Sequence, residues 1–240
     1  MKALLLAAGL GSRLRPLTNE MPKCLVPIGG KPLLEIWIEQ LIEAGVDEFF
    51  INIHAHAQMV HTFLQQNDFD CVINCLDEAE LLGTGGTLRK NAQFFADGPF
   101  LCAHADNFCL ADFRAFFAAH SNRSPEVEIT MMTFVTDQPQ SCGVVETNGK
   151  GIVTKFQEKV SNPTSNRANA AVFVMEPSVA HRLGADDRDV IDFCADELPK
   201  YVGLMQTWAN DIYHLDIGTP ENYSRANRDW QKMVQDKKGP

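Results

Sequence analysis

The chain has 240 residues, of which 45% are hydrophobic and 22% are charged, enough for one large α/β domain or two small ones. Its net charge of −10 argues against nucleic acid or an anionic membrane as a partner, so any phosphate site must be a local concentration of cations. The seven cysteines form no C-x-x-C pair, no apolar run approaches the ~20 residues of a membrane span, and no signal peptide is apparent, so we expect a cytoplasmic protein with reduced thiols.

Residues 2–32 carry the densest pattern of the chain. The apolar run from Ala3 to Ala8 predicts a buried strand of the parallel type. Two glycines and three cations follow it at tight spacing: Gly9, Gly11, Arg13, Arg15 and Lys23. Glycines allow the backbone to turn sharply and approach a ligand, and guanidinium groups can then close over its charge. We therefore predict a loop that wraps a polyphosphate.

Other glycine loops fit this stretch less well. A plain strand-to-helix turn with solvated arginines would account for the glycines, but not for the cations and prolines that follow. No Gly-Lys-Ser/Thr follows the glycines, so the stretch is not a P-loop. Arg13 and Leu14 stand where a dinucleotide fingerprint has its third glycine, which argues against an NAD(P)-dependent oxidoreductase.

Alternating helical and strand patterns continue to residue 105. They predict helices over 32–45 and 57–66 and strands over 47–53, 71–76 and 99–105. Strands alternating with helices favour a parallel sheet. Gly83, Gly85 and Gly86 precede a further expected helix, Leu88 to Phe95, and predict either a second close-approach loop or a flexible helix start.

Asp106 follows the strand over 99–105 directly. A carboxylate at the carboxyl end of a central parallel strand lies where α/β sheets bind ligands, although an Asp there can also cap a turn. A helix over 112–120 comes next.

From residue 126 the pattern changes to strands over 126–135, 142–146 and 151–158. Asn148-Gly149 between alternating runs predicts a hairpin, and hence an antiparallel extension. Later elements are expected at 166–175 (strand), 177–183 and 191–200 (short helices), 205–208 (strand) and Pro220 onward (helix). We expect one domain over 1–230, whose pattern changes after about residue 120, and a frayed tail over 231–240.

Three motifs carry a family resemblance. Gly9-x-Gly-x-Arg13-Leu-x-Pro-Leu-Thr18, followed by Pro22-Lys23 and Gly30-Lys-Pro32, resembles the signature of sugar-1-phosphate nucleotidyltransferases. Leu-Gly-Thr-Gly-Gly at 82–86 and Asp-Ile-Gly-Thr-Pro at 216–220 are similar to that family's later motifs. The resemblance implies an α/β, Rossmann-like fold of the GT-A type, with a mixed, mostly parallel sheet and an antiparallel sugar-binding extension. It also implies that the nucleotide-binding part of the domain is about 1–120 and the sugar-binding part about 121–230.

The resemblance also implies residue roles. Asp106 and Asp216 would bind Mg²⁺, and the catalytic residues would be Arg13, Lys23 and Asp106. The nucleotide would contact Leu6, Ala8, Gly9, Gly11, Ser12, Arg13, Gly83 and Gly85. The sugar phosphate would contact Gly143, Glu158, Lys159 and Asn169. The chain departs from the family at Ala105 and Ala171, where relatives usually have glycine; Ala171 would narrow the sugar pocket.

The expected reaction is nucleotidyl transfer from a nucleoside triphosphate, with GTP favoured, to a sugar 1-phosphate. A UTP-dependent N-acetylmuramate-1-phosphate uridylyltransferase and a non-catalytic nucleotide-sugar sensor on the same fold remain alternatives. Choline-phosphate cytidylyltransferases share the N-terminal motif but tend to lack the Leu-Gly-Thr-Gly-Gly loop. The sequence contains no left-handed β-helix, so we expect no acetyltransferase activity. It leaves open whether the protein is a monomer or a homo-oligomer.

Overall fold

The computed structural model describes residues 1–185 and 187–236. By their internal contacts, these residues form two compact units, each of which is discontinuous in sequence. Unit 1 comprises Met1–Leu4, Glu80–Ala103 and Ala111–Ile212, and unit 2 comprises Leu5–Ala79, His104–Leu110 and the stretch from Tyr213 onward. Within the described residues, every helix is too short or too polar to cross a membrane.

Unit 2 begins with the strand–helix–strand pattern that the sequence predicts. It holds the end of β1 (Lys2–Leu6), then α1 (Leu33–Glu43), β4 (Glu48–Ile53), α2 (Ala57–Gln66) and β5 (Val72–Asp77). β4 pairs with β5 in parallel, in register from Glu48↔Val72 to Ile53↔Asp77. The apolar residues of α1 recur at helical spacing, so that Leu34, Trp37 and Leu41 are fully buried.

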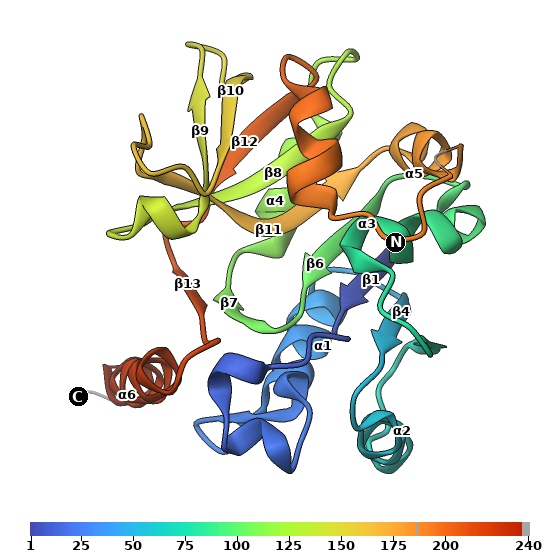
Figure 1. Cartoon of the computed structure of the whole chain (residues 1–240), viewed down its shortest axis with the longest axis vertical. Coiled ribbons are helices and arrows are strands. Elements are labelled where there is room, and N and C mark those ends of the chain that lie inside the picture. Colours follow the sequence, from blue (N-terminus) through green and yellow to red (C-terminus); the bar gives the residue numbers. More distant parts are fainter. Residues whose placement is uncertain (186, 237–240) are drawn as a thin grey trace. The chain divides into compact units, whose positions relative to one another are not determined.

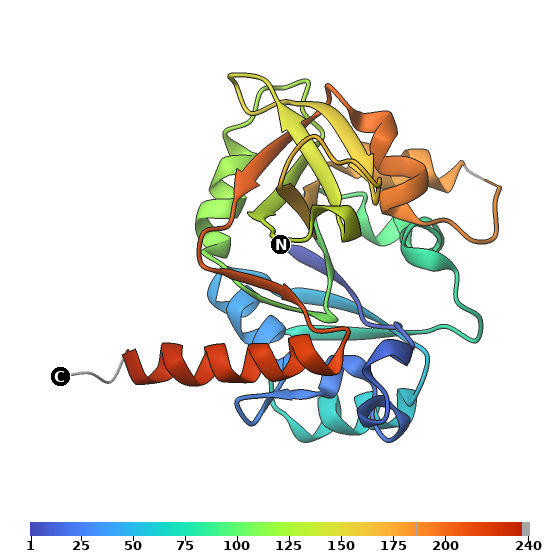
Figure 2. The ribbon, with the colours of Figure 1, turned by 60° about the vertical axis from the view of Figure 1, so that its left-hand side comes forward.

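The remaining elements of unit 2 come from three separate parts of the chain. They are the short hairpin β2 (Pro27–Ile28) and β3 (Lys31–Pro32), β7 (Asn107–Leu110), β13 (Tyr213–Asp216) and α6 (Pro220–Asp236). α6, drawn along its length in Figure 2, joins the hairpin through Tyr223, whose hydroxyl donates to the Pro27 carbonyl at 2.9 Å. Asn227 accepts from the Gly29 amide at 2.9 Å. The C-terminal helix is therefore fastened to the N-terminal part of unit 2.

Unit 1 contains the antiparallel pairs of the large sheet (Figure 1). Its strands are β6 (Phe100–His104), β8 (Ile129–Val135), β9 (Gly143–Thr147), β10 (Val153–Glu158), β11 (Arg167–Met175) and β12 (Met205–Ala209). β11 pairs antiparallel with β6, β8 and β9, and β12 pairs with β8 in parallel. β9 and β10 form the predicted hairpin, with Glu158 opposite Gly143.

The helices of unit 1 are α3 (Gly83–Lys90), α4 (Phe113–Ser121) and α5 (Pro177–Gly184). Asp112 caps α4 by accepting from the Ala115 amide at 2.9 Å, and it follows a strand rather than lying inside the helix as the range 112–120 implied. Pro177 stands in the first turn of α5, where its missing amide hydrogen costs nothing.

Several predicted boundaries were wrong. α3 begins at Gly83 instead of Leu88 and ends at Lys90, followed by a separate 3-10 turn over Ala92–Phe95. The short helix expected over 191–200 is a π turn (Phe193–Glu197) followed by a 3-10 turn (Leu198–Tyr201). β8 starts at Ile129, three residues late, and β7 was not predicted at all.

The predicted fold class is confirmed: helices alternate with a mixed sheet, and an antiparallel hairpin extends it. The division of a single domain near residue 120 stays a prediction, because the contact units interleave along the chain. α6 continues through Asp236, so residues 231–236 of the expected tail are helical; residues 237–240 lie outside the described residues.

Candidate active site

Unit 2 brings one lysine against two aspartates. The Lys23 ammonium lies 3.0 Å from Asp106 Oδ2 and 3.2 Å from Asp216 Oδ1. The Lys23 side chain is only 5% exposed, whereas those of Asp106 and Asp216 are 26% and 45% exposed. A nearly buried cation thus bridges two carboxylates that remain open to solvent.

The pairing of β7 with β13 explains why the two aspartates meet. Asp106 stands just before β7, and the amide of its neighbour Ala105 donates to the Leu6 carbonyl at 3.0 Å, which fixes the chain there. Asp216 is the last residue of β13 and lies opposite Asn107 in the antiparallel register. Two residues far apart in sequence therefore occupy neighbouring positions at one strand end.

The loop after β1 delivers Lys23. Gly11 adopts a left-handed backbone conformation (φ 60°), which residues other than glycine adopt only at a cost in free energy. A Cβ at Gly11 would lie 2.8 Å from Thr18 Cγ2 and 3.3 Å from Lys23 Cβ. The Thr18 hydroxyl donates to the Gly11 carbonyl at 2.7 Å and so closes the loop. Gly11 is thus needed both for its conformation and for the close approach of Lys23.

Further positive charge surrounds Asp216. The Arg13 guanidinium lies 3.2 Å from Asp216 Oδ2, with its own side chain 69% exposed. The Gly218 amide donates to Asp216 Oδ1 at 2.8 Å. Partial burial would raise the pKa of Asp216, but Lys23, the Gly218 amide and Arg13 together hold that pKa below its usual value. Asp216 is therefore ionised at neutral pH.

Two glycines leave no room for side chains beside the carboxylates. A Cβ at Gly218 would lie 2.8 Å from both Arg13 Nη2 and Asp216 Oδ1. A Cβ at Gly9 would lie 3.3 Å from Asp106 Oδ2. Backbone therefore borders the cluster closely, as a site for a polyphosphate requires.

The other predicted nucleotide contacts in unit 2 lie on the same stretch. Leu6 ends β1, Ala8 is buried just beyond it, and Ser12 is exposed at the start of a 3-10 turn. The structure adds Asn52, which is 4% exposed and whose Oδ1 accepts from the Ala7 amide at 2.7 Å. Asn52 holds the backbone that leads into the glycine loop.

The glycines of α3 belong to unit 1, where the amides of Gly85 and Gly86 already have a partner. The amides of Gly85 and Gly86 donate to the Ile191 carbonyl at 2.8 and 3.3 Å. A Cβ at Gly85 would lie 2.6 Å from Ile191 Cγ2, and Gly83 (φ 74°) likewise approaches the Ile191 backbone. The absence of side chains at these glycines therefore lets the Ile191 backbone approach α3, which the sequence analysis did not predict.

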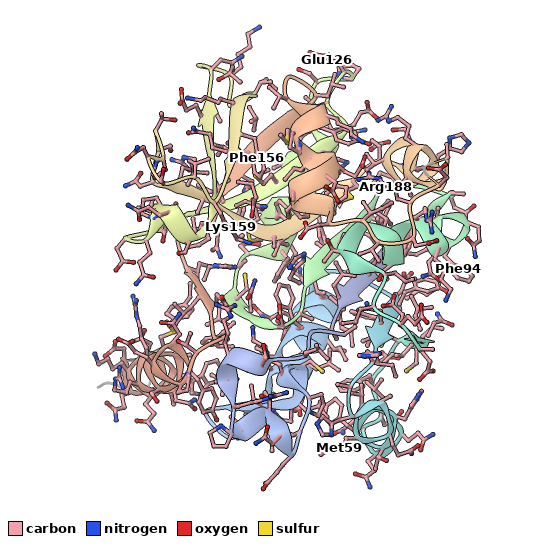
Figure 3. The ribbon with its side chains drawn as sticks, viewed as in Figure 1. Met59, Phe94, Glu126, Phe156, Lys159 and Arg188 are labelled. Atoms are coloured by element: carbon pink, nitrogen blue, oxygen red, sulfur yellow. The ribbon has the colours of Figure 1, made fainter. Side chains whose placement is uncertain are left out.

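The four predicted sugar-phosphate residues also belong to unit 1. Lys159 and Glu158 pair at 3.2 Å, and the Lys159 side chain is 65% exposed; Figure 3 labels it together with Phe156. A Cβ at Gly143 would collide with the Glu158 carboxylate and lie 2.9 Å from Phe156 Cζ, so a larger residue there would require these side chains to shift. Partial burial would lower the pKa of Lys159, but the adjacent Glu158 carboxylate raises it above its usual value.

Asn169, the fourth of these residues, stands beside an irregular part of β11. The register of β11 against β8 shifts between Asn169 and Phe173. Within the shift, Ala171 has a left-handed conformation (φ 54°), and its amide donates to Asn169 Oδ1 at 2.8 Å. Glycine would adopt this conformation without strain, which gives a conformational reason for glycine at the matching position of the resembling family.

Sequence reasoning missed Gly218, Asn52 and the Ile191–Cys194 segment as parts of these clusters. A polar residue within the apolar run Phe-Phe-Ile-Asn-Ile was the signal for Asn52, and Gly218 lay inside a motif that was already recognised. Nothing local in the sequence marks Ile191–Cys194.

The acidic pair suits a divalent cation of the magnesium type. Mg²⁺ prefers oxygen ligands and is usually held by one or two carboxylates together with substrate phosphates. Asp106, in the turn before β7, and Asp216, at the end of β13, already converge on one cation, Lys23 Nζ. Within residues 1–185 and 187–236, no group of three or more His, Cys, Asp or Glu side chains gathers as a metal site. The donor set therefore fits a metal completed by phosphate oxygens.

Comparison with known proteins gives consistent results. A family model described as Nucleotidyl transferase matches residues 2–233. The mannose-1-phosphate guanylyltransferase 1 of Arabidopsis thaliana is 32% identical over 233 residues, which cover 93% of this chain and 63% of that protein. The mannose-1-phosphate guanyltransferase of Schizosaccharomyces pombe is 31% identical over 234 residues, covering 93% and 62%. The chain thus spans a little over three fifths of the length of these curated relatives.

A solved structure shares the fold. HddC from Yersinia pseudotuberculosis, in a crystal structure complexed with GMP-PN, superposes with a TM-score of 0.79 at 23% sequence identity. The superposition covers 95% of this chain and 99% of that one.

Proposed function

Because the chain belongs to the nucleotidyl transferase family, as its motifs predicted, we propose that it transfers a nucleotidyl group from a nucleoside triphosphate to a sugar 1-phosphate. A guanylyl group from GTP and a mannose-type sugar 1-phosphate are the favoured substrates. Two relatives named as mannose-1-phosphate guanylyl- or guanyltransferases support this choice. The observation that carries the proposal is the Lys23 bridge between Asp106 and Asp216, bordered by Gly9 and Gly218.

The reaction requires little covalent chemistry from the protein. An oxygen of the sugar phosphate forms a bond to the α-phosphorus of the triphosphate, and the bond from that phosphorus to the β-phosphate oxygen breaks, releasing pyrophosphate. Both reactants are anions that repel each other. The protein accelerates such a step mainly by neutralising and aligning the two groups.

The cations of unit 2 supply that neutralisation. Arg13, exposed at the rim of the cluster, would cover the triphosphate. Lys23, held by two carboxylates, would bridge the α-phosphate and the incoming phosphate. In unit 1, Lys159 would hold the sugar phosphate as a point charge on a flexible stem.

Asp106 and Asp216 would hold Mg²⁺ through their carboxylate oxygens. When bound there, Mg²⁺ would supply positive charge to the phosphate oxygens during the reaction. Their two negative charges also hold the Lys23 ammonium in place through ion pairs, so the same carboxylates serve the lysine and the metal.

The remaining expectations concern partners. The proposed partners are a nucleoside triphosphate and a sugar 1-phosphate, with neither nucleic acid nor membrane. The net charge of −10 supports this choice, because an acidic chain disfavours contact with nucleic acid and anionic membranes.

The deciding experiment is pyrophosphate release with Mg²⁺, crossing GTP, UTP, dTTP, CTP and ATP with mannose 1-phosphate, a heptose 1-phosphate and N-acetylmuramate 1-phosphate. We expect release only when both substrates are present, with GTP and a hexose- or heptose-type phosphate fastest. Fastest release with UTP and N-acetylmuramate 1-phosphate would instead identify the uridylyltransferase. Nucleotide binding without release from any pair would identify a sensor.

A further inference from the structure

One short segment of unit 1 contacts two predicted binding elements at once. Residues Ile191–Cys194, which we name the strap, follow α5 and lie against the first turn of α3. The Ile191 amide donates to the Leu82 carbonyl at 3.0 Å, and the Ile191 carbonyl accepts from the Gly85 amide at 2.8 Å. The start of α3 is thereby joined to the strap by backbone hydrogen bonds in both directions.

A side chain adds to this connection. The Thr84 hydroxyl oxygen accepts from the Phe193 amide at 2.8 Å. Thr84 lies between Gly83 and Gly85, the two residues of α3 that are predicted to contact the nucleotide. Because this bond uses a side chain, substitution can remove it without altering the backbone of either segment.

At its other end the strap contacts the sugar side. Cys194 Sγ accepts a hydrogen bond from Asn169 Nδ2 at 3.5 Å. Asn169 Oδ1 accepts from the Ala171 amide at 2.8 Å. A flipped carboxamide would turn Nδ2 toward that amide donor, so the two contacts together fix which way the group points. Within the described part of the chain, these contacts leave one Nδ2 hydrogen and one Oδ1 lone pair of Asn169 for a ligand.

The strap is buried at Ile191, Phe193 and Cys194, and only Asp192 between them is exposed. Ile191 and Phe193 are 0% and 3% exposed, and the Phe193 ring meets the Phe173 ring of β11 edge-on at 5.5 Å. Because a packed interior deforms little, displacement at one end of a segment this short moves the other end. Thr84 and Asn169 are therefore mechanically joined, although neither contacts the other through any described bond.

We propose that Thr84 and Cys194 are positioning residues of the sugar-phosphate site, which act through the strap to orient the Asn169 carboxamide. The inference rests on the proposed function, because it assigns Asn169 to sugar-phosphate binding. Thr84 stands on the nucleotide-side helix, and yet its hydroxyl serves the sugar side as well. The sugar selectivity of the site then depends on residues outside the set that contacts the sugar.

Two pairs of variants test this. Thr84→Val keeps the shape and removes the hydroxyl, whereas Thr84→Ser keeps the hydroxyl. Cys194→Ala removes the acceptor, whereas Cys194→Ser replaces sulfur with another acceptor. We expect T84V and C194A each to raise KM for mannose 1-phosphate about 5- to 10-fold, the value of one lost hydrogen bond, with kcat nearly unchanged. T84S and C194S should recover most of the loss.

A double mutant distinguishes joint action of Thr84 and Cys194 through the strap from two independent effects. If both residues act through Asn169, the T84V/C194A double variant should raise KM less than the product of the single changes. Thr130→Val is the matched control: Thr130 is a fully buried threonine of unit 1 whose hydroxyl bonds with His120 and Gln206, away from the strap. T130V should leave KM for mannose 1-phosphate unchanged.

Calorimetric binding of mannose 1-phosphate gives a second readout without turnover. Weaker binding to T84V and C194A, restored in T84S and C194S, would support the proposal. Unchanged binding to both valine and alanine variants, with wild-type binding intact, would overturn the strap while sparing the proposed function. If wild-type protein neither bound nor turned over any sugar 1-phosphate, the proposed function would fail first, and the inference with it.

Discussion

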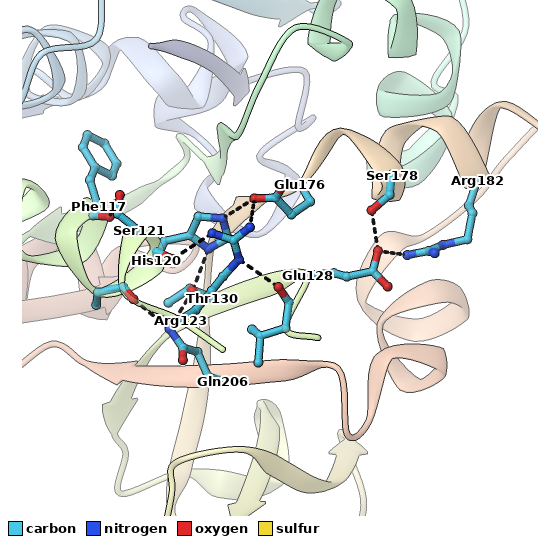
Figure 4. A network of polar contacts seen from close by, with 12 residues as sticks. Phe117, His120, Ser121, Arg123, Glu128, Thr130, Glu176, Ser178, Arg182 and Gln206 are labelled. Atoms are coloured by element: carbon cyan, nitrogen blue, oxygen red, sulfur yellow. Dashed lines mark hydrogen bonds and ion pairs between the residues drawn. The ribbon is translucent and has the colours of Figure 1, made fainter. Parts of the chain in front are cut away.

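The molecule uses buried charge in two contrasting ways. In unit 2 the Lys23 cluster (Lys23, Asp106, Asp216 and Arg13) is open: Lys23 is buried, but Asp216 and Arg13 are 45% and 69% exposed. In unit 1 the His120 network of Figure 4 is closed: His120 is 2% exposed and lies between Thr130 Oγ1 at 2.7 Å and Glu176 Oε1 at 3.0 Å. Arg123 completes that network by pairing with Glu176.

The difference lies in what surrounds the polar atoms. Gly9 and Gly218 border the Lys23 cluster, so backbone rather than further side chains adjoins its carboxylates, which stay partly exposed to solvent. In the His120 network the surrounding side chains satisfy one another; Gln206 Nε2, for example, donates to both Thr130 Oγ1 and the Ala119 carbonyl. Ionised groups that are partly exposed can still bind a ligand. A network in which buried polar side chains pair with one another is typical of a structural role. Substitutions in the first cluster should therefore change activity, and those in the second should change stability.

The largest effect is expected from the aspartates. Asp106→Asn and Asp216→Asn keep the shape but remove a charge that would hold Mg²⁺ and that anchors Lys23. We expect each to lower kcat for pyrophosphate release by about 10²–10³ or more. The melting temperature should change little, because both carboxylates are partly exposed. Thermal unfolding and pyrophosphate assays on the same samples give both values, and near-normal turnover in either variant would contradict the metal assignment.

Glu176→Gln should show the opposite result. The Glu176 carboxylate pairs with both His120 and Arg123, so loss of its charge leaves Arg123 with a weaker partner. We expect a loss of about 2 kcal/mol in the free energy of unfolding, with kcat and KM within about twofold of wild type. Urea unfolding, followed by circular dichroism, measures the free energy of unfolding. A marked fall in kcat at normal stability would mean that the closed network takes part in function.

Lys159→Ala tests a cation that lies in neither the Lys23 cluster nor the His120 network. Its side chain is 65% exposed and its only described ion pair is with the neighbouring Glu158, so its removal should hardly affect stability. We expect KM for the sugar 1-phosphate to rise about tenfold, with KM for GTP unchanged. A change confined to KM for GTP would contradict the assignment of Lys159 to the sugar phosphate. Lys155→Ala is the matched control on the same hairpin, where Lys155 pairs with Glu146.

The smallest effect should appear in the pH dependence of stability. Burial lowers the pKa of His120 below its ordinary value of 6.5, and the Arg123 guanidinium adds to this, while Glu176 opposes it. Below about pH 6.5 the unfolded histidine binds a proton that the folded one does not, so the free energy of unfolding should fall as the pH drops. In His120→Gln this fall between about pH 7 and about pH 5.5 should be smaller. Identical slopes by urea unfolding would show that another group dominates.

Local sequence patterns were enough to predict many of the helices and strands. The helical spacing of Leu34, Trp37 and Leu41 placed α1, and Asn148-Gly149 placed the β9–β10 hairpin, because amphipathic periods and turn residues act within a few positions. The start of α3 was misplaced because glycines normally end helices. Here the Ile191 carbonyl accepts from the Gly85 and Gly86 amides of its first turn. That partner lies about a hundred residues away, beyond any local signal.

The sequence by itself determined the family, the fold class and the residue types of the candidate site, because its motifs stand at ordered spacing along most of the chain. Only the tertiary structure decided that Lys23 bridges Asp106 and Asp216, since that contact requires β7 and β13 to pair across a long stretch of chain. It also decided that Cys194, one of seven cysteines without distinctive spacing, touches Asn169. Contacts of this kind depend on how distant segments pack, and packing leaves no periodic trace in the residues that make them.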